Sequence, residues 1–217
     1  MGHILLDSNR LRLYNTIIAS NHRTESGFNL ERASQICGFR LKVADIEASP
    51  RVSLLPGEHP WSHPILPEGG ELDAFGTGPF DFDDSSGGNT GPIFYIETQP
   101  NVTILGLQDV LGEPGYAVRE MDGWTSVWTS APNIHSAMLR QLGQDSGVHL
   151  YSETDDLLHA ARELLLFQAK SPGQKTLHWP HRFESVTDLY TGETVAESAD
   201  KWTVNLRANE TRFWRVI

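Results

Sequence analysis

The chain has 217 residues, with 17 Lys and Arg against 28 Asp and Glu and a formal net charge of −11 at pH 7. A hydrophobic fraction of 39% is enough to build a core, and the length suits one large domain or two small ones. The acidic balance argues against nucleic-acid and membrane-surface binding, because both need clustered Lys and Arg. No apolar run reaches the ~20 residues that a membrane span requires.

The first residues lack the basic start, long apolar stretch and cleavage site of a signal peptide. If this N-terminus is native, we expect a cytoplasmic protein. Cys37 is the single cysteine, which excludes an internal disulfide and a Cys-rich zinc site. We expect no cofactor.

The N-terminal half predicts a layered α/β domain. Leu5–Tyr14 predicts a short amphipathic helix, and Thr16–Ser20 predicts a buried strand. A second helix is expected over Leu30–Cys37, because Asn29 can cap its start and Gly38 suits its C-terminal end. Another helix is expected over Ile134–Leu142, capped by Asn133. Strands are predicted at Phe39–Val43, Val52–Leu55, Ile93–Glu97, Val102–Leu105, Tyr116–Met121, Trp124–Thr129 and Val148–Tyr151.

A long acidic segment interrupts this domain. No Lys or Arg occurs from Val52 to Val118, a stretch that carries ten Asp and Glu residues. Within it, residues 56–91 are rich in Gly, Pro and Asp, and are too long for an ordinary connection. We expect a functional loop or a mobile excursion here. The acidic segment could bind a cation, although a solvated acidic face is the favoured interpretation.

After Ser152 the sequence changes to short β-type runs separated by turn residues, which predicts a small antiparallel β-sandwich. The predicted domains are therefore residues 1–152 and residues 153–217. The strands expected in the second domain are Leu157–Ala161, Leu164–Ala169, Lys175–His178, Val186–Tyr190, Trp202–Leu206 and Thr211–Val216.

Several segments carry a family resemblance. The first three segments are Gly91-Pro-Ile-Phe-Tyr, Gly115-Tyr-Ala-Val-Arg-Glu-Met-Asp-Gly-Trp-Thr-Ser-Val-Trp and Gly147-Val-His-Leu-Tyr-Ser-Glu. The tail adds Asp188-Leu-Tyr-Thr-Gly-Glu and Asn209-Glu-Thr-Arg-Phe-Trp-Arg. Together these segments resemble the non-catalytic C-terminal region of large bacterial β-galactosidase-like glycoside hydrolases. The resemblance covers the chain from about Leu11 to its end.

The resemblance implies a partial flavodoxin-like (class I amidotransferase-like) α/β domain followed by a small β-sandwich, next to a catalytic (β/α)8 barrel. A barrel needs about 250 residues, for which this chain has no room. The opening helix also lacks the preceding strand that a parallel α/β sheet normally has. We therefore expect a fragment, a split-gene product, or a subunit that another chain completes.

Three carboxylates in the acidic segment are the candidate metal ligands. Asp81, Asp83 and Asp84 lie in Asp-Phe-Asp-Asp-Ser-Ser-Gly, which resembles the start of a calcium loop. The glycine and the distal glutamate of such a loop would fall at Ser86 and Pro92, so the pattern fails at both. A flexible acidic loop is the favoured interpretation, and use of these carboxylates as a catalytic pair is the least favoured one.

Cysteine and histidine offer weaker candidates. Cys37 could act as the nucleophile of an amidotransferase, but its place near the end of a predicted helix favours a small buried residue. His59 and His63 have metal-ligand spacing, although Pro60 and Pro64 make a regular helix there unfavourable. His178 and His181 flank a Trp-Pro turn. Surface histidines are the favoured interpretation of both pairs.

Two tryptophans are candidate sugar platforms. Trp61 and Trp179 lie in Pro-rich segments, where an exposed ring could stack against a glycan or pack against a partner. Core packing is the default interpretation of a tryptophan in a strand.

Three functional hypotheses follow. The first is a non-catalytic accessory region that scaffolds a catalytic barrel, a subunit of a glycoside hydrolase, or its own copies. The second is a carbohydrate-binding module that uses Trp61 or Trp179. The third is a free-standing glycoside hydrolase, for which the sequence offers no convincing carboxylate pair. We favour the first.

Overall fold

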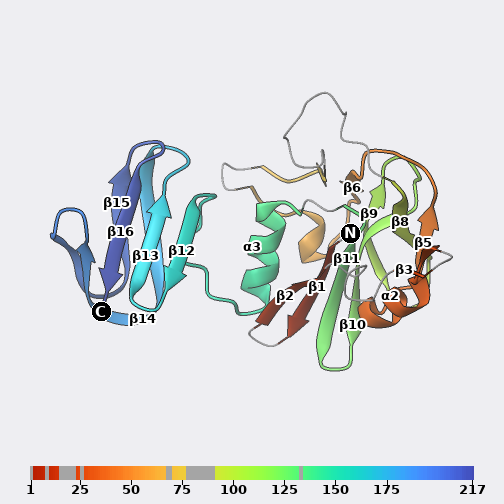
Figure 1. Ribbon diagram of the computed structural model, residues 1–217, viewed down its shortest axis with the longest axis horizontal. Coiled ribbons are helices and arrows are strands. Elements are labelled where there is room, and N and C mark those ends of the chain that lie inside the picture. Colours follow the sequence, from red (N-terminus) through yellow and green to blue (C-terminus); the bar gives the residue numbers. More distant parts are fainter. Residues whose placement is uncertain are drawn as a thin grey trace. The chain divides into compact units, whose positions relative to one another are not determined.

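The computed structural model describes residues 2–7, 10–14, 23–24, 27–66, 70–76, 91–131 and 134–217. The chain divides into two compact units, Met1–Val148 and His149–Ile217 (Figure 1). We call these the N-terminal and C-terminal units. Among the described residues, no helix is long and apolar enough to cross a membrane.

The N-terminal unit contains a seven-stranded sheet with the order β2-β1-β11-β10-β9-β6-β7, in which every pair of neighbours is antiparallel. Two further antiparallel pairs, β3–β4 and β5–β8, lie outside this sheet. The strands are β1 (Gly2–Asp7), β2 (Arg10–Tyr14), β3 (Arg23–Thr24), β4 (Gly27–Phe28), β5 (Leu41–Ala44), β6 (Val52–Leu54), β7 (Ala74–Phe75), β8 (Ile93–Ile96), β9 (Thr103–Gln108), β10 (Pro114–Met121) and β11 (Trp124–Thr129).

The predicted flavodoxin-like (class I amidotransferase-like) layering is therefore wrong. Parallel strands need crossover connections of a dozen or more residues, usually through a helix. Here β10 and β11 are joined by the two-residue turn Asp122-Gly123, in which Gly123 has φ +79°, and β9 reaches β10 through a short turn. Turns of this length connect antiparallel neighbours.

The predicted opening helix is also wrong. Leu5–Tyr14 spans parts of β1 and β2, which pair antiparallel with Leu6 opposite Leu11. Arg10-Leu-Arg-Leu-Tyr14 alternates polar and apolar residues, and this period of two is typical of a strand. Because this helix is not formed, the expectation that a strand is missing in front of it no longer has a basis. The strand predicted at Thr16–Ser20 lies outside the described residues.

The helix predicted at Leu30–Cys37 is confirmed as α2 (Leu30–Cys37). The Asn29 side chain accepts a hydrogen bond from Arg32 N (3.0 Å), and Gly38 ends the helix with φ +79°. The second helix, α3 (Ser136–Asp145), begins later than expected and is capped by His135. Asn133, its predicted cap, lies outside the described residues. A short 3-10 helix, η1, spans Pro60–Ser62.

The central strands of the N-terminal sheet are buried on both faces. On one face, Ala117 and Trp128 join a cluster with Ala33 and Cys37 of α2. On the other face, Val118 and Val127 join a cluster with Met138 and Leu142 of α3. Figure 1 shows α2 and α3 on opposite sides of the β10–β11 hairpin.

The C-terminal unit is one five-stranded antiparallel sheet with the order β12-β13-β16-β14-β15. The β14–β15 pairing is interrupted between His178 and Phe183, which divides both long strands into two halves. The second half of β15, residues 201–206, faces β16, since the rings of Trp202 and Trp214 lie 5.8 Å apart although their strands are not paired. The strands are β12 (Leu157–Ala161), β13 (Leu164–Gln168), β14 (Gly173–Asp188), β15 (Thr194–Leu206) and β16 (Thr211–Val216).

The sandwich expected after residue 152 is thus a single sheet that folds back on itself. Two layers enclose one core, and β14 and β15 run through both of them, with their pairing interrupted between His178 and Phe183. The predicted strands Lys175–His178 and Val186–Tyr190 fall largely within one long strand, β14. The strand predicted at Val148–Tyr151 is not formed; a single bridge from Ser152 to Leu177 is found instead.

Candidate functional site

The first candidate sugar platform, Trp61, is buried in the N-terminal unit. Its exposed fraction is 9%, and its indole N–H donates to Asp145 at the end of α3 (2.5 Å). Its backbone N–H donates to His59 Nδ1 (3.2 Å), and the two rings meet edge to face. Burial lowers the pKa of His59, against the opposing effect of the nearby Glu120 and Asp145 carboxylates. These contacts fasten η1 to α3 and leave Trp61 little open face for a sugar.

The second candidate, Trp179, is buried in the C-terminal unit. Its exposed fraction is 6%, and its ring packs edge to face against Tyr151 (5.4 Å) and beside His181 (6.3 Å). Trp179 lies where β14 bends, and its ring belongs to the core of the unit. The exposure that a stacking platform needs is therefore not found at either tryptophan.

The candidate metal ligands Asp81, Asp83 and Asp84 lie outside the described residues. Within the described part of the chain, no three His, Cys, Asp or Glu side chains come together as a metal site would require. His63 Nδ1 lies 3.4 Å from Glu71, and His178 Nε2 lies 3.4 Å from Glu153.

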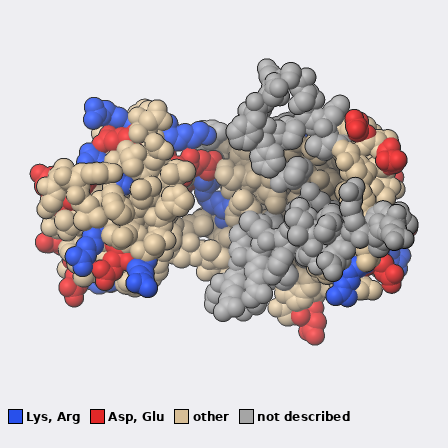
Figure 2. Space-filling model, in the orientation of Figure 1, with Lys and Arg blue, Asp and Glu red and all other residues tan. Residues whose placement is uncertain are grey.

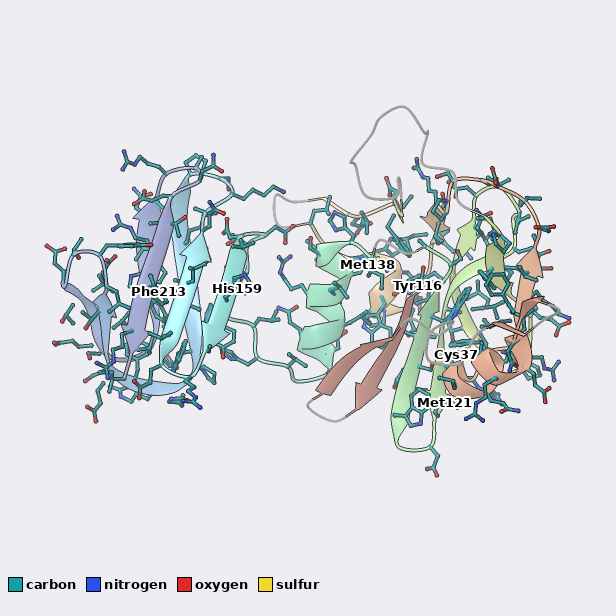
Figure 3. The ribbon with its side chains drawn as sticks, in the orientation of Figure 1. Cys37, Tyr116, Met121, Met138, His159 and Phe213 are labelled. Atoms are coloured by element: carbon teal, nitrogen blue, oxygen red, sulfur yellow. The ribbon has the colours of Figure 1, made fainter. Side chains whose placement is uncertain are left out.

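The prediction of a buried structural Cys37 is confirmed. The side chain is 0% exposed, at the end of α2 and beneath β11 (Figure 3). Burial raises the pKa of the Cys37 thiol to about 12, so the thiolate that nucleophilic catalysis needs is not formed near neutral pH. Ser126 donates a hydrogen bond to the Cys37 carbonyl (2.6 Å), which ties the helix to the sheet.

A buried ion pair crosses the C-terminal unit. Lys175 on β14 lies 2.9 Å from Asp156, and their side chains are only 3% and 1% exposed. Burial would raise the pKa of Asp156, but hydrogen bonds from Thr154, from Lys175 and from the Lys170 backbone outweigh it and lower that pKa. Because the Asp156 carboxylate accepts all these hydrogen bonds, we interpret the ion pair as structural and not as the source of a free nucleophile or general base.

The outer face of the C-terminal sheet is the candidate interaction surface, which we call the outer face. Strand register places its residues in adjacent rows, with His159 opposite Leu166 and Leu166 opposite Phe213. Figure 3 shows His159 and Phe213 on the strands that flank β13. The face consists of Leu157, His159, Ala161, Leu164, Leu166, Gln168, Thr211, Phe213 and Arg215.

This face is apolar and partly open. Leu157 is 51% exposed and Leu164 is 39% exposed, while Leu166 and Phe213 are half-buried. Arg215 is its one charged residue and lies 3.4 Å from Glu163. In the view of Figure 2, the middle of this unit is mostly tan and charged side chains lie mainly around its margin.

Sequence reasoning missed the outer face, although a signal was present. The run Leu164-Leu-Leu-Phe167 is apolar at every position, whereas a strand with one solvated face alternates apolar and polar residues. Leu165 and Phe167 point into the core, so Leu164 and Leu166 must point outward.

Comparison with known proteins gives one distant likeness. No protein-family model matches the chain, and no curated protein matches it. A crystal structure of β-galactosidase from Bacillus circulans sp. alkalophilus is similar, with a TM-score of 0.47 and 10% sequence identity. The match covers 86% of this chain and 25% of that one, so the chain spans about a quarter of the β-galactosidase chain. A likeness this distant does not establish the fold or the activity.

Proposed function

We propose that the chain is a non-catalytic accessory region of a β-galactosidase-like glycoside hydrolase, and that its C-terminal unit docks onto another part of the assembly. The observation that carries the proposal is the outer face. Leu164 and Leu166 are apolar on a strand whose opposite side is already filled by Leu165 and Phe167. Strands that are apolar on both sides are typical of sheets covered on both sides.

Two further features support docking. The outer face has one charged side chain among the nine residues that form it, and protein interfaces are depleted of charge at their centre. Its edge strand, β12, has the sequence Leu-Leu-His-Ala-Ala, with no acidic residue, Lys, Arg or Pro. Natural edge strands usually carry such residues, because a bare edge pairs readily with other chains.

The sequence resemblance supports the choice of partner. The segments that resemble the β-galactosidase-like enzymes include β10, β11, the turn after β14 and β16. The proposed partner is therefore a catalytic barrel-containing chain or a second copy of this chain.

Light scattering on the purified chain tests the proposal, first alone and then mixed with a barrel-containing glycoside hydrolase from the same genome. We expect a defined oligomer or a stable heterocomplex. A double variant, Leu157→Lys with Leu164→Lys, should remain monomeric because it adds two charges to the outer face. Val110→Lys is the matched control, since Val110 is 57% exposed in the N-terminal unit. A wild-type monomer that ignores the partner would overturn the proposal, as would assembly that survives the double variant.

A further inference from the structure

One edge of the C-terminal sheet is formed by β12, the end strand of the order β12-β13-β16-β14-β15 (Figure 1). Among the described residues, β13 is the one strand that pairs with it. The side chains of Leu157, His159 and Ala161 are exposed along this strand. An edge strand presents backbone N–H and C=O groups that can pair with a strand of another chain.

The hydrogen bonds between β13 and β16 show which way the backbone groups of β13 point. The N–H of Ala169, directly after β13, donates to the carbonyl of Glu210 (2.9 Å). At the other end of β13, the N–H of Val216 donates to the carbonyl of Glu163 (2.7 Å). Because backbone groups alternate in direction along an antiparallel strand, the odd-numbered residues of β13 bond to β16 and the even-numbered residues bond to β12.

The same alternation identifies the groups at the free edge of β12. Its odd-numbered residues, Leu157, His159 and Ala161, lie opposite the even-numbered residues of β13 and bond to them. The N–H and C=O groups of Leu158 and Ala160 therefore point to the free edge. These two residues offer both donors and acceptors to an incoming antiparallel strand.

The sequence of β12, Leu-Leu-His-Ala-Ala, is complementary to a second copy of itself. If two antiparallel copies are centred on His159, Leu158 of one copy lies opposite Ala160 of the other. Every edge N–H and C=O of both copies then finds a backbone partner. Leu157 likewise lies opposite Ala161 of the second copy, so a large side chain meets a small one on both faces of the sheet.

This pairing would also bury part of the outer face. Leu164 lies opposite Ala161 on the neighbouring strand, and Ala161 would lie opposite Leu157 of the second copy. The small alanine side chain leaves room for the two leucines to meet above it. Since Leu157 is 51% exposed and Leu164 is 39% exposed, their contact removes apolar surface from water and stabilises the pair of copies.

His159 would face its own counterpart at the centre of the pairing. Because its backbone groups bond to β13, the two histidines form a non-hydrogen-bonded pair, in which opposite side chains are closest. Imidazole is the side chain that ordinarily gains a proton between pH 8 and pH 5. Two like charges would then lie directly opposite each other, and such a pair is destabilising.

The surroundings of His159 in the sheet do not balance that charge. Its described neighbours on the outward side of β12 and β13 are uncharged: Leu157, Ala161, Leu164, Leu166 and Gln168. The charged residues closest to this patch lie just before β12, in the turn after it and on β16. Of these, Asp156 is bonded to Lys175 (2.9 Å), Glu163 is paired with Arg215 (3.4 Å), and Arg162 adds a further positive charge.

We infer that two copies of this chain pair through β12, antiparallel and centred on His159, so that their C-terminal sheets form one continuous sheet. The inference rests on the proposed docking and deepens it, because it names a second copy as the partner and the β12 edge as the contact. The pairing forms at neutral pH and weakens when both copies of His159 are protonated.

Sedimentation velocity on the full chain tests the inference at pH 7.5 and pH 5.5. We expect a dimer of the 24.2 kDa chain at pH 7.5, and a dissociation constant about tenfold higher at pH 5.5 because two positive charges then oppose each other. His159→Val should dimerise equally at both pH values, since its side chain stays neutral. His181→Val is the matched control: His181 is an exposed histidine on β14, so this variant should keep the pH dependence of the wild type.

Ala160→Pro tests the backbone contact itself. Proline removes an N–H that points to the free edge and not to β13, so the unit should keep its fold and its melting temperature in dilute solution. Its dissociation constant at pH 7.5 should rise by at least about tenfold, because each copy loses a donor and the ring obstructs the edge. If this variant does not fold, His159→Lys replaces it, and it should be monomeric at both pH values.

The outcomes separate this inference from the proposed docking. A wild-type dimer that survives Ala160→Pro, or that binds equally tightly at both pH values, would overturn the edge pairing, while Leu157→Lys with Leu164→Lys would still decide whether the outer face docks. A chain that is monomeric alone but binds the barrel-containing hydrolase would overturn the inference and leave the proposed function standing. A chain that does neither would overturn both.

Discussion

In the N-terminal unit, the central strands are apolar on both sides and both sides are covered, Trp128 by α2 and Val127 by α3. In the C-terminal unit, β13 has the same kind of sequence, but only Leu165 and Phe167 are enclosed. Leu164 lies outward at 39% exposure. The comparison indicates that a strand apolar on both sides needs two covers, and that the described part of the C-terminal unit provides one.

The two units also differ in where their ion pairs lie, and this difference gives the largest expected effect. Lys175→Met leaves the Asp156 carboxylate buried without its cation, and removing one partner of a buried pair costs about 3–5 kcal/mol. The matched change in the N-terminal unit is Arg51→Met, which breaks the half-exposed pair with Asp109 (3.2 Å) and should cost less than about 1 kcal/mol. Urea denaturation with peptide-resolved hydrogen exchange measures each unit separately.

The control for the buried pair is the double variant Lys175→Met with Asp156→Leu. It removes both charges, so most of the lost stability should return. Equal losses in the single and double variants would contradict this account, because the cost would then arise from packing alone.

Backbone crowding in the N-terminal unit gives the next effect. Gly76 has φ +84°, and a Cβ there would lie 2.4 Å from the Ala131 Cβ and 2.5 Å from the Pro50 carbonyl oxygen. Gly76→Ala should therefore destabilise this unit by about 2–4 kcal/mol, through both overpacking and backbone strain. Gly112→Ala is the control, since Gly112 has φ +68° with open space around its Cβ position. It should cost about 1 kcal/mol from strain alone, as denaturation midpoints will report.

A smaller difference between the two units is expected in how their stability depends on pH. The pKa of Asp156 is lower in the folded protein than its ordinary value, because donated hydrogen bonds outweigh burial. Its contribution is therefore fully present above the ordinary carboxyl pKa of about 4 and is lost as the pH falls through the folded-state pKa. The midpoint of the C-terminal unit should fall more between pH 5 and pH 3 in the wild type than in Lys175→Met with Asp156→Leu. An identical fall in both would contradict the assignment.

Local signals in the sequence predicted local structure well. Asn29 and Gly38 located both ends of α2, and the apolar runs located β8, β10, β11, β12 and β16 to within about two residues. The error was in how the strands pair. Asp122-Gly123 is a hairpin signal that favours antiparallel neighbours, whereas the predicted order of helices and strands favoured a layered α/β domain.

Residues that come together through the fold could not be found from the sequence. The rings of Trp202 and Trp214 come within 5.8 Å of each other although their strands are not paired, because β14 and β15 bend where their pairing is interrupted between His178 and Phe183. Trp61 and Trp179 illustrate the opposite case. Proline-rich surroundings made them candidates for exposure, but Asp145 and Tyr151, each distant in sequence, help to bury them.

The smallest expected effect is at the outward side of β13. Leu164→Lys places a charge on the outward side of β13 and should change the stability of the dilute chain by less than about 0.5 kcal/mol, as exposed substitutions usually do. Val127→Lys, at a 0% exposed position on β11, should unfold the N-terminal unit. A loss of several kcal/mol for Leu164→Lys at low concentration would mean that the chain itself covers the outer face. A partner supplied by association has a different signature: wild-type stability should rise with protein concentration and that of Leu164→Lys should not, because mass action stabilises only the form that associates.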